Sequence, residues 1–197
     1  FRQTSRSNRS IATKRFIHRS MKRQNLCALF VLSSNCLVLF LLFSWNDYWV
    51  RYGIYFHLPG LFFLFGSTRL SNRNGAMVAF LTGLLIDSTT TSSFGLHAFG
   101  LTLCHLIARE GGEGMKATRG LRPHIYQQVA NLFLIATLSI SSFVQSADTA
   151  FQGLDRLSID IIASQLLLIP LGAWFLAFQN NLPQFEGVES SSQPVTQ

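Results

Sequence analysis

The sequence predicts an all-α membrane protein with six transmembrane helices and both termini in the cytoplasm. Of its 197 residues, 48% are hydrophobic and only 13% are charged, whereas a soluble domain carries about 25% charged residues. Apolar runs follow one another with short polar breaks, and basic residues gather in alternate connections. The same composition excludes a disordered chain, and three cysteines are too few for a disulfide scaffold.

Six apolar runs account for the six helices. At about 1.5 Å per residue, the first nearly crosses a hydrocarbon core of about 30 Å. A group of aromatic residues follows it, as is typical of a bilayer interface; its members are Trp45, Tyr48, Trp49 and Tyr52. The runs are residues 26–43, 54–66, 76–86, 94–108, 126–143 and 159–178.

Three of these runs need a comment. The second and third are shorter than the roughly 17 residues of a full span. The second contains Pro59-Gly60 and can extend to Leu70, with Arg69 reaching the interface through its long side chain. The sixth contains Pro170. We nevertheless expect all six to be membrane-spanning helices, because five or seven spans would mix the charged connections.

The basic residues indicate the orientation. Residues 1–25 hold eight of the 16 Lys and Arg and no acid. With six spans, all basic residues except Arg51 and Arg156 lie on the side of the termini. This is the pattern of the positive-inside rule. The net charge of +7 is therefore an orientation signal and does not indicate nucleic-acid binding.

The chain divides into three parts. We expect a basic cytoplasmic tail over 1–25, a six-helix membrane domain over 26–180 and a polar C-terminal tail over 181–197. The basic tail would lie at anionic lipid headgroups, at about 1 kcal/mol per basic residue. An organelle transit peptide or the start of a signal peptide is the alternative. The sequence begins with Phe1, and Met21 is an alternative start, in which case part of the tail is not native.

Motifs of soluble enzymes are missing from the sequence. It contains no phosphate-binding loop, no dinucleotide fingerprint, no HExxH and no CxxC. Cys27, Cys36 and Cys104 lie scattered in apolar runs, where cysteine usually acts as a small hydrophobe. His105 follows Cys104 without further ligands at zinc spacing. We therefore expect no enzyme activity, no cofactor and no metal.

Small and polar residues within the runs predict contacts between helices. The pairs Ala79/Gly83 and Ala173/Ala177 have the small-xxx-small spacing that permits close packing. Three amide side chains are expected to hydrogen-bond between helices, with a ligand cavity as the alternative; they are Gln127, Asn131 and Gln165.

The most informative stretch is residues 83–98. Asp87 ends one apolar run, a series of Ser and Thr follows, and Gly95 and His97 open the next run. A charge at the membrane boundary is costly unless it is paired or hydrated. Asp87 can meet His97 or the N–H groups that begin the next helix, and the Ser92 and Ser93 hydroxyls can cap that helix.

Three interpretations of this stretch compete. Asp87 and His97 could form a proton relay or a polar ligand site. An Asp, a His and several Ser could also form a membrane-embedded hydrolase, although nothing marks one Ser as an activated nucleophile. The favoured interpretation is a hairpin whose polar groups satisfy each other and set the crossing of two helices, because a relay normally needs several acids within the spans.

This stretch resembles the MreD family, the membrane subunit of the bacterial rod-shape machinery. Members typically end their third helix with Gly-Leu-Leu-x-Asp, and a Gly, a Leu, a His or Asn, and an Ala follow in a fixed register. The matching residues are Gly83, Leu84, Leu85, Asp87, Gly95, Leu96, His97 and Ala98. The layout of six helices in under 200 residues is similar too. The sequence departs at Ser93, often Pro in the family, at Thr91, often Gly, and in its long basic tail.

The resemblance implies a non-enzymatic scaffold in the bacterial cytoplasmic (inner) membrane, acting in cell shape and peptidoglycan synthesis. The implied partners are an MreC-like bitopic protein, a RodA-like glycosyltransferase and a class B penicillin-binding protein, with membrane lipids around them. The implied bundle is similar to the substrate-binding subunits of energy-coupling-factor transporters. The alternative function is therefore a vitamin-binding transporter subunit. Those subunits often carry an Ala-xxx-Ala pair in the first helix, where this sequence has Ala28 and Leu32.

Overall fold

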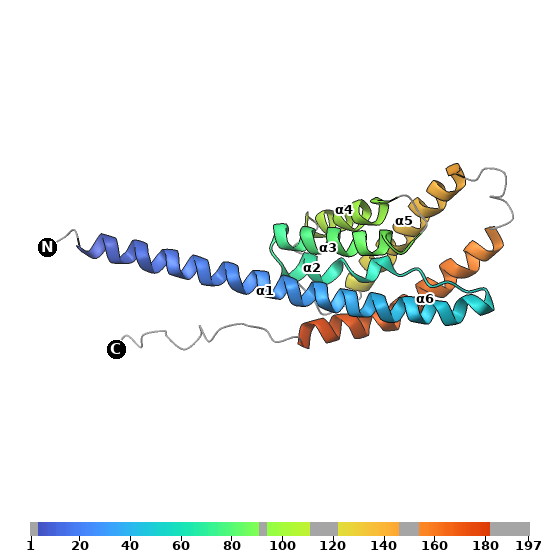
Figure 1. Ribbon diagram of the computed structural model, residues 1–197, viewed down its shortest axis with the longest axis horizontal. Helices are drawn as coiled ribbons and strands as arrows, with labels where there is room; N and C mark the ends of the chain where they lie inside the picture. The colour runs from blue at the N-terminus through green and yellow to red at the C-terminus, as the bar shows by residue number, and fades with distance from the viewer. Residues whose placement is uncertain (1–3, 91–93, 111–121, 146–153, 182–197) are drawn as a thin grey trace.

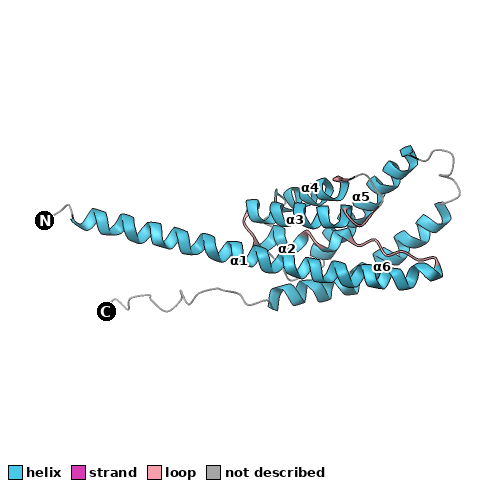
Figure 2. Cartoon of the chain, in the orientation of Figure 1, coloured by secondary structure: helices cyan, strands magenta, loops and turns pink. Residues whose placement is uncertain are grey.

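The computed structural model describes residues 4–90, 94–110, 122–145 and 154–181. Within these ranges the regular elements are all helices and there is no β-strand (Figure 2), which confirms the all-α prediction. The elements are α1 (Thr4–Trp49), η1 (Val50–Tyr52), η2 (Pro59–Leu61), α2 (Leu64–Arg69), α3 (Asn72–Asp87), α4 (Leu96–Glu110), α5 (Arg122–Gln145) and α6 (Leu154–Asn181). The expected polar tail after residue 181 lies outside these ranges.

The first helix is much longer than its apolar run. It continues without a break through residue 25, so the expected boundary there is not a helix end. Its N-terminal part projects beyond the other helices (Figure 1). At the other end, Gly53 stops the helical path with a φ of +77°, and its N–H donates to the Val50 carbonyl at 3.0 Å. A glycine takes this left-handed conformation without the strain of a Cβ atom.

The helix predicted over residues 54–66 is wrong. Residues 54–58 are non-helical, η2 adds one short turn, and α2 has only six residues. Pro59 explains the break, because proline lacks an N–H donor and disfavours helical geometry in the residue before it. Leu58 indeed has a φ of −124° and a ψ of 38°, outside the helical region. The second predicted span is therefore not a continuous helix.

The other four predicted runs form helices. The third lies within α3, the fourth overlaps α4, the fifth lies within α5 and the sixth within α6. Ser71 caps α3 by accepting the Asn74 N–H at 3.4 Å. Pro170 does not end α6.

The segment 54–69, which does not form one continuous helix, lies at the centre of the protein. Leu61, Phe62, Phe63 and Leu64 are almost completely buried. They belong to a core that also includes Leu101 of α4, Leu134 of α5, and Leu168 and Phe175 of α6. The Phe62 and Phe175 rings meet edge to face, with centroids 5.9 Å apart. The other helices therefore enclose the apolar run Leu-Phe-Phe-Leu.

Two described segments are long and apolar enough to cross a bilayer, Gln24–Tyr52 and Arg156–Gln179. Their most apolar windows have mean hydropathies of 2.5 and 2.0, yet only 28% and 22% of those windows is buried inside the protein. Large apolar side chains therefore face outward, among them Phe40 on α1 and Leu166 on α6. An apolar helix that exposes most of its surface is suited to a lipid environment.

Candidate functional site

Asp87 closes the hairpin between α3 and α4. It is the last residue of α3, and the residue is only 3% exposed. One carboxylate oxygen accepts the N–H groups of Gly95 and Ala98 at 3.0 and 3.1 Å. The other accepts the His97 N–H at 3.0 Å. An acid at the end of one helix thus caps the start of the next, where the positive end of the helix dipole also favours a negative charge.

The imidazole of His97 completes this arrangement. Its Nδ1 lies 2.8 Å from the Asp87 carboxylate, and the side chain is fully buried. A carboxylate only accepts hydrogen bonds, so Nδ1 carries the hydrogen. The His97 Nε2 lies 3.2 Å from the His57 Nε2. One hydrogen must lie between these two nitrogens, because two lone pairs would otherwise face each other in a partly buried site.

Two glycines of the motif make this geometry possible. A Cβ atom on Gly83 would lie 2.3 Å from the Ala98 Cα, so α3 and α4 touch backbone to backbone there. Gly95 has a φ of +96°, a conformation that a residue with a side chain adopts only with strain. Ala98 is fully buried and Leu96 is half-buried. The residues of the motif thus form one structural unit around Asp87.

A second cluster holds the non-helical segment, and sequence reasoning missed most of it. Four backbone N–H groups of the segment donate to polar side chains from three helices. The pairs are Tyr55 with Asp160 (2.8 Å), Phe56 with Asn46 (2.9 Å), His57 with Ser164 (2.8 Å) and Gly60 with Asn131 (3.0 Å). Non-helical backbone is tolerated at membrane depth only where protein groups or water satisfy it.

The two asparagines of this cluster each make a pair of bonds. The Asn46 amide accepts the Phe56 N–H and donates to the Phe56 carbonyl, both at 2.9 Å. The Asn131 amide accepts the Gly60 N–H and donates to the His57 carbonyl at 3.1 Å. Each side chain therefore replaces the partner strand that an extended segment would otherwise need. A polar residue within an apolar run was the available signal for Asn131, whereas Asn46 lies beside Asp47 and carried no such signal.

A third polar contact joins three helices. The Asn35 amide of α1 donates to the Thr82 hydroxyl of α3 at 3.0 Å and accepts from the Gln179 amide of α6 at 3.3 Å. All three side chains are buried. Such bonds between apolar helices fix their relative rotation, since each leaves an unpaired polar group if the helix turns.

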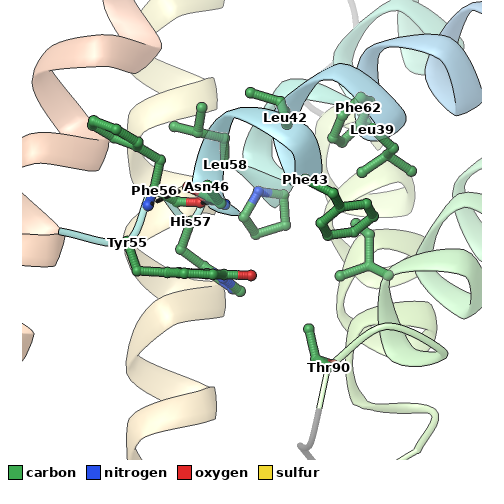
Figure 3. Close-up of a pocket in the computed structure, with 12 residues that line it drawn as sticks. Leu39, Leu42, Phe43, Asn46, Tyr55, Phe56, His57, Leu58, Phe62 and Thr90 are labelled. Carbon is green, nitrogen blue, oxygen red and sulfur yellow. Dashed lines mark hydrogen bonds between the residues drawn. The ribbon is translucent and has the colours of Figure 1, made fainter. Parts of the chain in front are cut away.

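The small pocket beside His57 has a volume of about 30 Å³. Figure 3 shows Tyr55 and His57 on one side of it, with Phe43 and Thr90 opposite. Small-molecule sites usually measure about 300–1,000 Å³. The pocket is thus large enough for a water molecule and too small for a vitamin.

The remaining predicted residues have mixed outcomes. Asn131 forms the expected bonds, but the buried amides of Gln127 and Gln165 have no hydrogen-bond partner in the described residues. Ala79 and Gly83 are buried against neighbouring helices, as expected. Ala173 and Ala177 are exposed, so the close packing that their spacing permits does not occur between the described helices.

Other residues singled out by their chemistry lie apart from the hairpin. His105 is fully buried beside Gly75, where a Cβ atom would lie 2.2 Å from its ring. Cys104 is buried, Cys27 is half-buried and Cys36 is exposed. In the described part of the chain, no three His, Cys, Asp or Glu side chains come together as a metal site. Ser92 and Ser93 lie outside the described residues.

Long apolar helices whose side chains face outward are typical of an α-helical membrane protein. Comparison with known families matches residues 26–181 to MreD, described as rod shape-determining protein MreD. Because this match covers most of the chain, the protein belongs to the MreD family, a family of membrane proteins that determine rod shape. No curated protein and no solved structure matches the chain.

Proposed function

We propose that the protein is a non-enzymatic scaffold subunit of the bacterial cell-wall elongation complex, acting in peptidoglycan synthesis and cell shape. The observation that carries the proposal is the MreD match over residues 26–181. The geometry supports it, because the Asp87 carboxylate accepts hydrogen bonds from three backbone N–H groups of the protein itself. Such a group stiffens a hairpin instead of attacking a substrate.

We further propose that the chain crosses the cytoplasmic membrane six times, with both termini inside. The segment 54–69 has room for the second crossing despite its short helix. Extended residues rise about 3.3 Å each, 3₁₀ residues about 2.0 Å and α-helical residues about 1.5 Å, so the segment reaches about 30 Å. Figure 1 supports this path, since the trace after α1 runs back along α1 toward α2. On this path, the start of α1 and the end of α6 lie on the same side of the membrane.

The partners in this proposal are an MreC-like bitopic protein, a RodA-like glycosyltransferase and a class B penicillin-binding protein. We expect them to bind through outward-facing apolar helix faces and through the outer loops. The face of α6 with Ala173, Trp174 and Ala177 is one such surface, because small residues let a second helix approach closely. Its large neighbour Trp174 is 54% exposed and available to a partner.

Affinity purification of the tagged full chain from its own membranes tests the proposal. The expected result is recovery of an MreC-like protein and of a protein labelled by fluorescent penicillin. Substituting Ala173→Leu and Ala177→Leu together should reduce this recovery. Ile140→Leu, at an exposed position of α5, serves as a volume-conserving control. Absence of these partners, together with tight binding of a vitamin, would favour the transporter alternative and overturn the scaffold role.

A further inference from the structure

A groove between α1 and α3 has the features of an amphiphile site. Its volume is about 460 Å³, within the range of small-molecule pockets of about 300–1,000 Å³. It is remote from the Asp87 hairpin, because it lies along the first half of α3 while Asp87 ends that helix. Its lining is polar at one end and apolar along the rest.

The polar end combines a cation with amide groups. Arg73 is exposed, and no carboxylate in the described residues pairs with it. Beside it, the Asn74 amide donates to the Asn25 side-chain oxygen at 3.2 Å, which joins α3 to α1 at the mouth of the groove. Gln24 adds a further amide. The first turn of α3 begins here, so the positive end of its dipole adds to the Arg73 charge.

The apolar part continues from this end along both helices. Ala28 and Leu32 lie on successive turns of α1, and Met77 and Leu81 on successive turns of α3. From Arg73 to Leu81 the helix rises about 12 Å, which takes the groove from an interfacial cation into the hydrocarbon region. Met77 is 58% exposed, so the apolar wall is open toward the outside.

We propose that this groove binds an anionic glycerophospholipid, with its phosphate at Arg73 and an acyl chain between Ala28 and Leu81. Basic pockets between membrane helices on the cytoplasmic side are the usual sites for anionic headgroups, and the basic residues predict that this end faces the cytoplasm. A neutral apolar helix in the groove would leave the Arg73 charge without an anionic partner. Arg73 therefore favours a lipid over a second apolar helix.

Lipid retention by the purified full chain tests the site. The probe is phosphatidylglycerol, compared with phosphatidylcholine, and bound lipids are counted by native mass spectrometry after detergent exchange. We expect Arg73→Gln to weaken phosphatidylglycerol binding about fivefold, the factor that corresponds to about 1 kcal/mol per basic residue. Arg51→Gln, an exposed arginine outside the groove, should leave the binding unchanged.

A second pair of variants tests the apolar part. Ala28→Phe should fill the groove and reduce binding of both lipids, whereas Leu37→Phe, on an exposed position of the same helix outside the groove, should not. Equal binding of the two lipids by the unaltered protein would overturn the proposal, as would unchanged retention in both Arg73→Gln and Ala28→Phe. Loss of a protein partner with unchanged lipid retention in Ala28→Phe would assign the groove to a helix and also overturn it.

Discussion

The His97 imidazole lies 2.8 Å from the Asp87 carboxylate, and its other nitrogen lies 3.2 Å from His57. These contacts connect the hairpin of α3 and α4 to the non-helical segment at the centre of the protein. The two clusters of polar contacts are therefore one continuous system. The connection between them passes through the buried His97 ring and the partly buried His57 ring.

Removal of the Asp87 side chain should strongly destabilise the protein. Asp87→Ala leaves three backbone N–H groups and the His97 ring without their acceptor, so we expect a loss of about 3 kcal/mol or more. Thermal unfolding in detergent measures this loss. Asp47→Ala, on an exposed acid of α1, is the matched control. Equal melting temperatures of the two variants would show that the Asp87 bonds contribute nothing.

A methyl group at Gly83 should force α3 and α4 apart. Because its Cβ atom would lie 2.3 Å from the Ala98 Cα, we expect Gly83→Ala to cost about 1–3 kcal/mol, as overpacking does. Gly83→Leu should prevent folding. Ala76→Leu, on a half-buried position of the same helix, is a size control. The amount of folded protein in size-exclusion chromatography gives the answer, and a normal elution profile for Gly83→Leu would contradict the close contact.

Replacement of Asn131 should loosen the central segment. Asn131→Leu keeps the size of the side chain but leaves the Gly60 N–H and the His57 carbonyl unpaired. Each unpaired group costs about 1–3 kcal/mol. Amide hydrogen exchange should become faster at residues 55–61 while α3 stays protected. The control is Leu132→Ala, on the exposed neighbouring position; similar exchange in both variants would rule out the proposed role.

The six-span topology predicts opposite labelling of two arginine positions. Cysteine at Arg51→Cys should react with a membrane-impermeant maleimide in intact cells. Cysteine at Arg73→Cys should react only after the membrane is opened. Both positions are exposed in the structure, so accessibility is decided by the side of the membrane. The native cysteines are first replaced by serine, and labelling of both positions from outside would contradict the topology.

Part of the site could be predicted from residue types alone. Asp87 stands out because it is an acid at the end of an apolar run, and burial without a partner is costly there. Gly95 and His97 lie within the following turn, close enough in the chain for a local hairpin to bring them together. The sequence offered two partners for Asp87, the N–H groups that begin the next helix and the His97 side chain. The structure contains both contacts, with the Gly95 N–H and with the His97 ring.

The sequence alone determined the all-α class and the segregation of basic residues, because hydropathy and charge act on each segment without reference to its neighbours. Pro59 also indicated a break, but its consequence depended on distant residues. Only the tertiary structure decided that Asn46, Asn131, Asp160 and Ser164 hold the broken segment, since these bonds join residues up to 107 positions apart. Periodicity cannot encode such pairings. They exist because backbone groups removed from water must find partners wherever the fold supplies them.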